Sequence, residues 1–172
     1  MSRSPLDDAF GHHTWATLRL IDACQALDPT QLQGPVPGTY GPILDTMRHL
    51  VSSDSWYLHR CSGARTQPIS DEEEARMDLA AMRAAMERSA AGWTELLAGD
   101  LDPDARIDTI RDDGSETHAP LGIRLAQAIH HGTDHRSQIC TALTSLGIEP
   151  PLIDVWDFGG DTGRVTEVPP TG

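Results

Sequence analysis

Four long stretches of the chain repeat apolar residues at three- and four-residue steps, the spacing of a helix with one buried face. They cover about residues 6–27, 43–61, 71–98 and 121–146. The third stretch opens with the capping-box pattern Ser70-Asp71-Glu72-Glu73, and Gly147 follows the fourth as a normal helix end. We therefore expect an all-α fold with four long helices.

The pattern changes between the third and fourth helices. Residues 106–110 alternate between polar and apolar side chains, Asp113-Gly114 is a hairpin-turn dipeptide, and residues 116–118 could form a returning strand. Because an isolated two-stranded hairpin is only marginally stable, we expect this hairpin-like insertion to lie against the helices. His118 is expected at the surface.

The C-terminal segment is rich in proline and glycine and carries one apolar cluster, between Leu152 and Phe158. We expect this cluster to fold back onto the helices, so that residues 1–158 form the domain and residues 159–172 a loosely ordered tail. We hypothesise that Asp154, Trp156 and Asp157 border the mouth of a site.

Composition limits the choice of partners. The chain has 172 residues, enough for one domain with its own core, and its 13 basic and 26 acidic residues give a formal charge of -13. Nucleic acids and anionic membranes are bound through basic patches, so we expect neither as a partner. The N-terminus has no apolar signal core and no 18-residue apolar run occurs, which favours a cytoplasmic protein.

The cysteines suggest no chemistry of their own. Cys24, Cys61 and Cys140 are far apart in the sequence, odd in number and without Cys-x-x-Cys spacing, so we expect neither a disulfide framework nor a cysteine metal site. Each lies in an apolar helical pattern, where a small buried side chain is the expected role.

The last predicted helix carries the candidate chemistry. It contains two pairs of possible metal ligands one turn apart, His130 with Asp134 and His131 with His135. On a helical wheel, His131 and His135 lie beside the apolar stripe, while His130 and Asp134 lie on the opposite side. Two inward imidazoles at this spacing can share one divalent ion. They could equally be hydrogen-bonded histidines at a helix interface, and a third convergent ligand would decide between these roles.

Polar residues on the first two helices are further candidates. His13 lies at the edge of an apolar face and could sit near a metal or be structural. Asp54 lies on an apolar stripe and needs a partner if it is buried: it could accept from a histidine, form a salt bridge or lie at a solvated edge. His49 lies on a second stripe to one side, with Trp56 two turns later, as in the wall of a pocket.

Two motifs give the chain a family resemblance. They are His49-Leu50 followed by Trp56 in the second helix, and His131-x-x-x-His135-Arg136-x-Gln138-Ile139 in the fourth. Together with the four long helices, they resemble the DinB-like (DinB/YfiT-like) superfamily over nearly the whole chain. The family often has His-Arg-Gly-Gln in the second motif, where this chain has Ser137 in place of the glycine.

The resemblance implies a four-helix bundle with up-down-down-up connections, which holds one divalent metal ion through His49, His131 and His135. The imidazole set suits zinc or nickel. The resemblance also implies an enzyme in which a low-molecular-weight thiol, such as bacillithiol, mycothiol or glutathione, attacks a small-molecule electrophile. A metal-bound thiol loses its proton near neutral pH, so this chemistry needs no protein cysteine. The wheel selects only His131 and His135, and the sequence identifies no catalytic residue.

Two other functions stay open. A metal-dependent hydrolase would use the ion to activate water and would need a general base, for which Asp54 and Asp157 are candidates. A non-catalytic, stress-related protein would use the histidines structurally or bind metal incidentally. A homodimer is compatible with each function, with the first and fourth helices as its interface.

Overall fold

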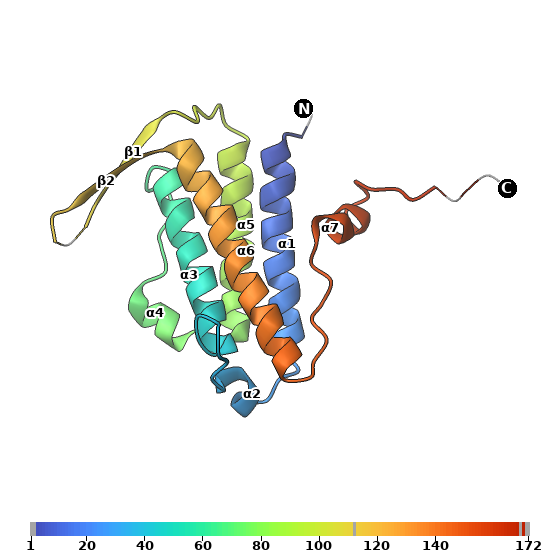
Figure 1. Ribbon diagram of the computed structural model, residues 1–172. Coiled ribbons are helices and arrows are strands. Elements are labelled where there is room, and N and C mark those ends of the chain that lie inside the picture. Colours follow the sequence, from blue (N-terminus) through green and yellow to red (C-terminus); the bar gives the residue numbers. More distant parts are fainter. Residues whose placement is uncertain (1–2, 112, 169, 171–172) are drawn as a thin grey trace.

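The computed structural model describes residues 3–111, 113–168 and 170, and four long helices dominate it (Figure 1). These are α1 (Pro5–Cys24), α3 (Ile43–Cys61), α5 (Leu79–Leu97) and α6 (Leu121–Ser145). In Figure 1, α1 and α6 run in one direction and α3 and α5 in the other. Because α3 and α1 each pack on both α5 and α6, the four helices enclose a common interior. The prediction of a mainly helical fold is confirmed.

Three short helices interrupt the predicted pattern: α2 (Pro29–Gln33), α4 (Asp71–Arg76) and α7 (Val155–Asp161). The prediction of one helix over residues 71–98 is wrong. Ser70 forms the expected capping box, but α4 ends after Arg76 because Met77 adopts an extended backbone, with φ -64° and ψ 128°. Asp78 then caps α5 by accepting from the Ala81 backbone N–H. A second capping residue inside the apolar pattern thus restarts the helix in a new direction.

A two-stranded hairpin connects α5 to α6 along the chain, as predicted, but it projects from the helices instead of lying against them over its length (Figure 1). Strand β1 (Arg106–Ile110) pairs antiparallel with β2 (Glu116–Pro120). Gly114 has φ +79° in the connecting turn, a conformation that glycine adopts without strain. Arg124 of α6 donates to the Ile107 carbonyl and to the Thr109 hydroxyl, and these bonds attach the hairpin to the helices.

The C-terminal segment packs against α1 through α7. The Phe158 ring lies edge-on to Trp15, with 5.7 Å between the ring centroids, and it also covers Gly11. α7 continues to Asp161, so three residues of the expected tail are helical. Residues 169, 171 and 172 of that tail, like residues 1, 2 and 112, lie outside the described part of the chain. Among the described residues, no helix is both long and apolar enough to cross a lipid bilayer.

Two apolar clusters fill the interior at different heights along the helices. One contains Leu20, Met47, Met86 and Leu143, and the other contains Phe10, Leu58, Trp93 and Leu125. All four long helices contribute to both clusters. In each long helix, buried polar residues lie between the residues of the first cluster and those of the second. These polar residues form a layer between the two apolar clusters.

The polar layer is a continuous hydrogen-bonded chain of four buried residues, which we call the buried polar chain: Arg136, His13, Asp54 and Trp93. Arg136 Nη1 donates to His13 Nδ1 at 3.0 Å. Because a guanidinium can only donate, His13 Nδ1 accepts, and its Nε2–H therefore donates to Asp54 Oδ1 at 2.9 Å. Trp93 Nε1–H donates to the same carboxylate, at 3.0 and 3.2 Å from its two oxygens. The buried polar chain therefore connects α1, α3, α5 and α6.

Charge is balanced within the buried polar chain. Burial lowers the pKa of Arg136 to about 10, and the Asp54 carboxylate opposes this shift. The guanidinium therefore stays protonated at neutral pH and offsets the carboxylate across a neutral imidazole. His13 is thus a structural residue, and a histidine is the partner that buried Asp54 requires.

Gly132 allows α6 to approach α1 closely beside the buried polar chain. A Cβ atom built on Gly132 would lie 2.3 Å from His13 Cε1 and 2.6 Å from His13 Nδ1. Only glycine fits here while the His13 ring keeps its hydrogen bonds to Arg136 and Asp54.

We expect Gly132→Ala to lower the free energy of unfolding by about 1–3 kcal/mol, because the new methyl group must displace a fixed imidazole. Urea denaturation followed by circular dichroism measures the change. Gly160→Ala is the matched control, since a Cβ at this α7 position meets nothing within 4 Å. Equal stability of the two variants would show that His13 is not held in place.

Candidate metal centre

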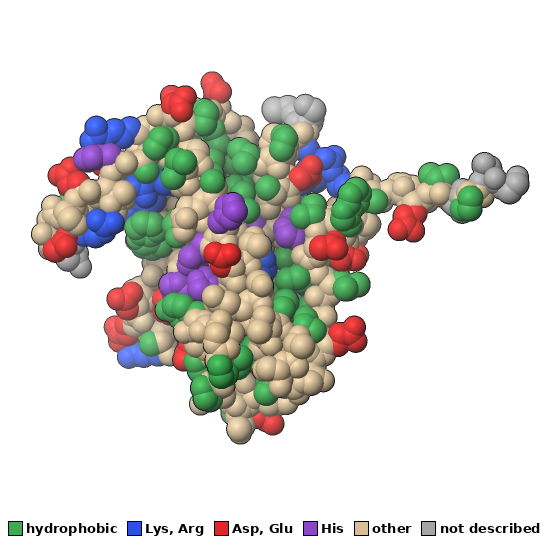
Figure 2. All heavy atoms as spheres, viewed as in Figure 1, with side chains coloured by type: hydrophobic (Ala, Val, Ile, Leu, Met, Phe, Trp, Pro, Cys, Tyr) green, Lys and Arg blue, Asp and Glu red, His purple; other side chains and the backbone are tan. Residues whose placement is uncertain are grey.

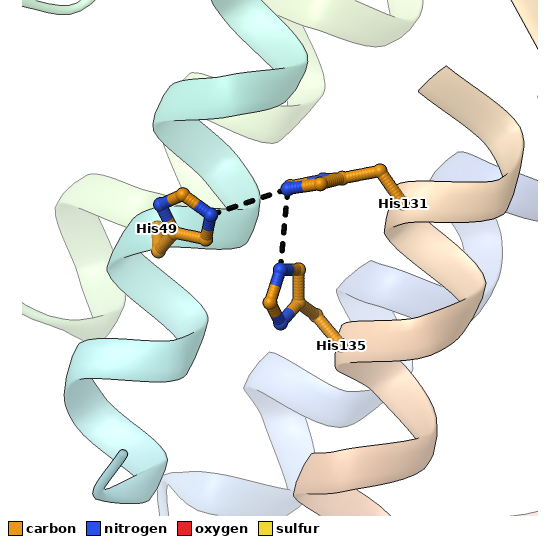
Figure 3. Close-up of side chains that lie close together, drawn as sticks. All are labelled: His49, His131 and His135. Atoms are coloured by element: carbon orange, nitrogen blue, oxygen red, sulfur yellow. Dashed lines mark hydrogen bonds between the residues drawn. The ribbon is translucent and has the colours of Figure 1, made fainter. Parts of the chain in front are cut away.

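Three histidines converge between α3 and α6, as Figure 3 shows. His131 and His135 lie one turn apart on α6, and His49 faces them from α3. The side stripe of α3 that carries His49 faces the neighbouring helix rather than the centre of the interior. His135 is buried, and His49 and His131 are partly buried. The structure therefore brings together the three residues that the resemblance selected.

The distances between these imidazoles fit a small divalent ion. His131 Nε2 lies 3.2 Å from His49 Nε2 and 3.2 Å from His135 Nε2. The ligand atoms that the three residues offer all lie within 4.8 Å of one another. With metal–nitrogen bonds of about 2.0–2.1 Å, neighbouring ligand nitrogens sit about 2.8–3.4 Å apart, the shorter value for octahedral and the longer for tetrahedral geometry. The two 3.2 Å distances to His131 fall in this range, so the donor set suits zinc or nickel.

The surroundings keep two of the imidazoles neutral. Burial, followed by the charges of the neighbouring His135 and His49, lowers the pKa of His131 from 6.5 to about 4. Burial, followed by the charge of His135, also lowers the pKa of His49, although Glu74 acts in the opposite direction. Neutral rings retain the nitrogen lone pairs that a metal requires.

Aromatic rings flank the three histidines. Tyr40 stacks on His49, with 4.3 Å between ring centroids and 10° between ring planes. Tyr57 of α3 meets His131 edge-on at 5.5 Å. Tyr40 also lines an adjacent cavity of about 340 Å³. The other residues of that cavity are Asp45, Arg48, Asp71, Glu74 and Ala75.

The remaining predicted residues lie elsewhere. His130 and Asp134 are exposed, as the wheel indicated, and His118 is at the surface. His13 and Asp54 belong to the buried polar chain, and neither forms a hydrogen bond with any of the three candidate ligand histidines. The hypothesis that residues 154–157 border the site is wrong, because Asp154 caps α7, which packs on α1 rather than beside His49.

Three neighbours of the histidines are residues for which the sequence predicts no role. Gln138 is part of the quoted motif, and its Oε1 accepts from His135 Nδ1–H at 3.0 Å. Tyr40 lies in a turn-rich linker, where no pattern indicates a contact with His49. Glu74 lies in α4, which the sequence predicts as part of one longer helix, and Ser52 donates a hydrogen bond to its carboxylate. Only Gln138 carried a usable signal, its distance of three residues from His135.

The comparison with known protein families agrees with this site. The model of the DinB family matches residues 1–162. The chain belongs to the DinB family. No curated protein matches it significantly. Membership in the DinB family and the three converging histidines together indicate a possible divalent-metal site in this DinB protein.

The lowered pKa of His131 predicts how the metal-free DinB protein responds to pH. Between pH 6.5 and about 4, the unfolded chain takes up a proton at His131 that the folded chain does not. Stability should therefore fall as the pH drops from 6.5 towards 4. The measurement is the urea midpoint of chelator-treated protein, for the wild type and for His131→Asn.

The difference between the two proteins isolates this residue, because carboxylates contribute equally to both. The wild type should lose more stability than His131→Asn between pH 6.5 and 5. Parallel pH profiles would mean that His131 is not kept neutral by the fold.

Proposed function

We propose that this DinB protein is a metal-dependent thiol S-transferase built on an up-down-down-up four-helix bundle. The observation that carries the proposal is the convergence of three Nε2 atoms from His49, His131 and His135. Three protein ligands leave coordination positions for another molecule, as in catalytic rather than structural metal sites. A bound divalent ion would lower the pKa of a thiol, so that it reacts as the thiolate.

The protein offers no thiol of its own for this chemistry. Burial raises the pKa of Cys24 to about 12 and that of Cys61 to about 11, and it also raises the pKa of Cys140. Such thiols are poor nucleophiles near neutral pH. This supports a nucleophile supplied by a low-molecular-weight thiol, with the protein holding it.

The proposed reaction is a substitution. The thiol loses its S–H proton to solvent, and the thiolate sulfur forms a bond to an electrophilic carbon. The bond from that carbon to its leaving group breaks, and the leaving group departs with the electron pair. The chain's own contribution is to converge the three imidazoles and to keep His49 and His131 neutral, while the rings of Tyr40 and Tyr57 pack against His49 and His131.

The structure gives less support to hydrolysis. Asp54, one of the two candidate bases, is only 2 % exposed and already accepts from His13 and Trp93. Asp157, the other, lies on α7 against α1. Neither carboxylate is in place to take a proton from water beside His131.

A turnover assay separates these functions. The metal-loaded protein is mixed with a chlorodinitrobenzene and a low-molecular-weight thiol, and thioether formation is followed. We expect thiol-dependent turnover in the wild type and at least about a 100-fold loss in His131→Ala, which removes a ligand. His130→Ala is the matched control, because His130 is the exposed neighbour on the same helix.

Equal rates in His131→Ala and His130→Ala would overturn the metal-dependent mechanism. Ester cleavage in the absence of any thiol would instead favour the hydrolase.

A further inference from the structure

One side-chain oxygen connects a candidate ligand to the loop that covers the site. Gln138 Oε1 accepts from His135 Nδ1–H at 3.0 Å and from the Tyr40 backbone N–H at 3.1 Å. The first bond places the proton of His135 on Nδ1, which leaves the Nε2 lone pair directed at His131. The second bond fixes the loop residue whose ring lies over His49.

Tyr40 contacts two of the three candidate ligands. Its ring stacks on His49 and meets His135 edge-on at 5.2 Å. Tyr40 is nevertheless 55 % exposed, so its position depends on few contacts besides the two imidazoles. The hydrogen bond to Gln138 and the turn around Gly38, where φ is +82°, keep it there.

The rest of the loop is built to hold this position. The Thr39 Oγ1 atom lies 2.8 Å from the Val36 carbonyl oxygen and 3.0 Å from the Gly41 carbonyl oxygen, and its single proton is shared between these two acceptors. These bonds close the turn on both sides of Tyr40. The ring is therefore presented to His49 by a fixed backbone.

We propose that Gln138 and Tyr40 are positioning residues of the metal centre and act as one unit. Gln138 fixes the rotation of the His135 ring, Tyr40 fixes that of His49, and the shared oxygen makes each contact depend on the other. Two of the three ligands are thus preorganised by residues that do not bind the ion themselves. This inference rests on the proposed function, because it assumes that the triad binds a metal.

Preorganisation has a measurable consequence for metal affinity. Hydrogen bonds that orient ligand histidines typically change metal affinity by about 10- to 100-fold. A stacked ring contributes less, equivalent to about a 2- to 10-fold change. The hydroxyl of Tyr40 takes no part in the stack, so the ring alone should suffice.

The test is Zn²⁺ affinity, measured by competition with a chromophoric chelator. Gln138→Leu should bind about 10- to 100-fold more weakly than the wild type. Gln138→Glu should retain the affinity, since a carboxylate can accept both hydrogen bonds. Tyr40→Ala should weaken binding by about 2- to 10-fold, and Tyr40→Phe should not change it.

The double variant tests the coupling. In Gln138→Leu the loop has already lost its anchor, so adding Tyr40→Ala should weaken binding less than Tyr40→Ala does alone. The visible spectrum of the Co²⁺-loaded protein should also change in Gln138→Leu, because ligand geometry sets that spectrum. Gln25→Leu, an exposed glutamine that bonds Asp22, controls for loss of an amide.

The outcomes separate this inference from the proposed function. Wild-type protein that binds no Zn²⁺ would overturn both. Wild-type binding that is lost in His131→Ala but unchanged in Gln138→Leu and Tyr40→Ala would overturn the positioning role alone. Additive effects in the double variant would show two independent contacts rather than one unit.

Discussion

The buried polar chain that runs from Arg136 through His13 to Asp54 and Trp93 is the constraint on which the site depends. A buried carboxylate without a partner is strongly unfavourable, and breaking such a pair costs about 3–5 kcal/mol. The buried polar chain supplies the hydrogen bonds of the Asp54 carboxylate only when α1, α3, α5 and α6 have one relative arrangement. It therefore selects the rotation of each helix more sharply than the two apolar clusters do, because apolar contacts tolerate sliding.

Helix α6 converts this constraint into a site. Gly132 and Arg136 point to α1 and its His13, while His131 and His135 point to α3. These two pairs of residues alternate along one helix. The contacts of Gly132 and Arg136 with α1 therefore set the rotation of α6, and this rotation directs His131 and His135 towards α3. Figure 2 shows several histidine side chains at the surface of this face of the molecule, with apolar side chains close by. The interior thus carries the structural charges, while His49 and His131 are only partly buried, so a small molecule can reach the site from their side.

The sequence predicted the long helices and the hairpin well, because their periodicity and turn residues are local properties. It did not indicate that residues 71–98 break at Met77, because Met77 and Asp78 are also tolerated inside a continuous helix, and only the structure shows that Asp78 caps α5. The wheel selected His131 and His135 and rejected His130 and Asp134, but it left His49 to the family resemblance. The partners of His13 and Asp54, and the contact of Tyr40 with His49, depend on packing between distant segments. No single-helix pattern contains that information.

The central claim is that His49, His131 and His135 bind one divalent ion, and elemental analysis of untagged, chelator-free protein tests it most directly. A polyhistidine tag would bring its own metal, so it must be absent. The account predicts about one equivalent of zinc or nickel in the wild type and in His130→Ala, and its loss in His49→Ala and His131→Ala. Metal that persists in both ligand variants, or that is absent from the wild type, would contradict the account.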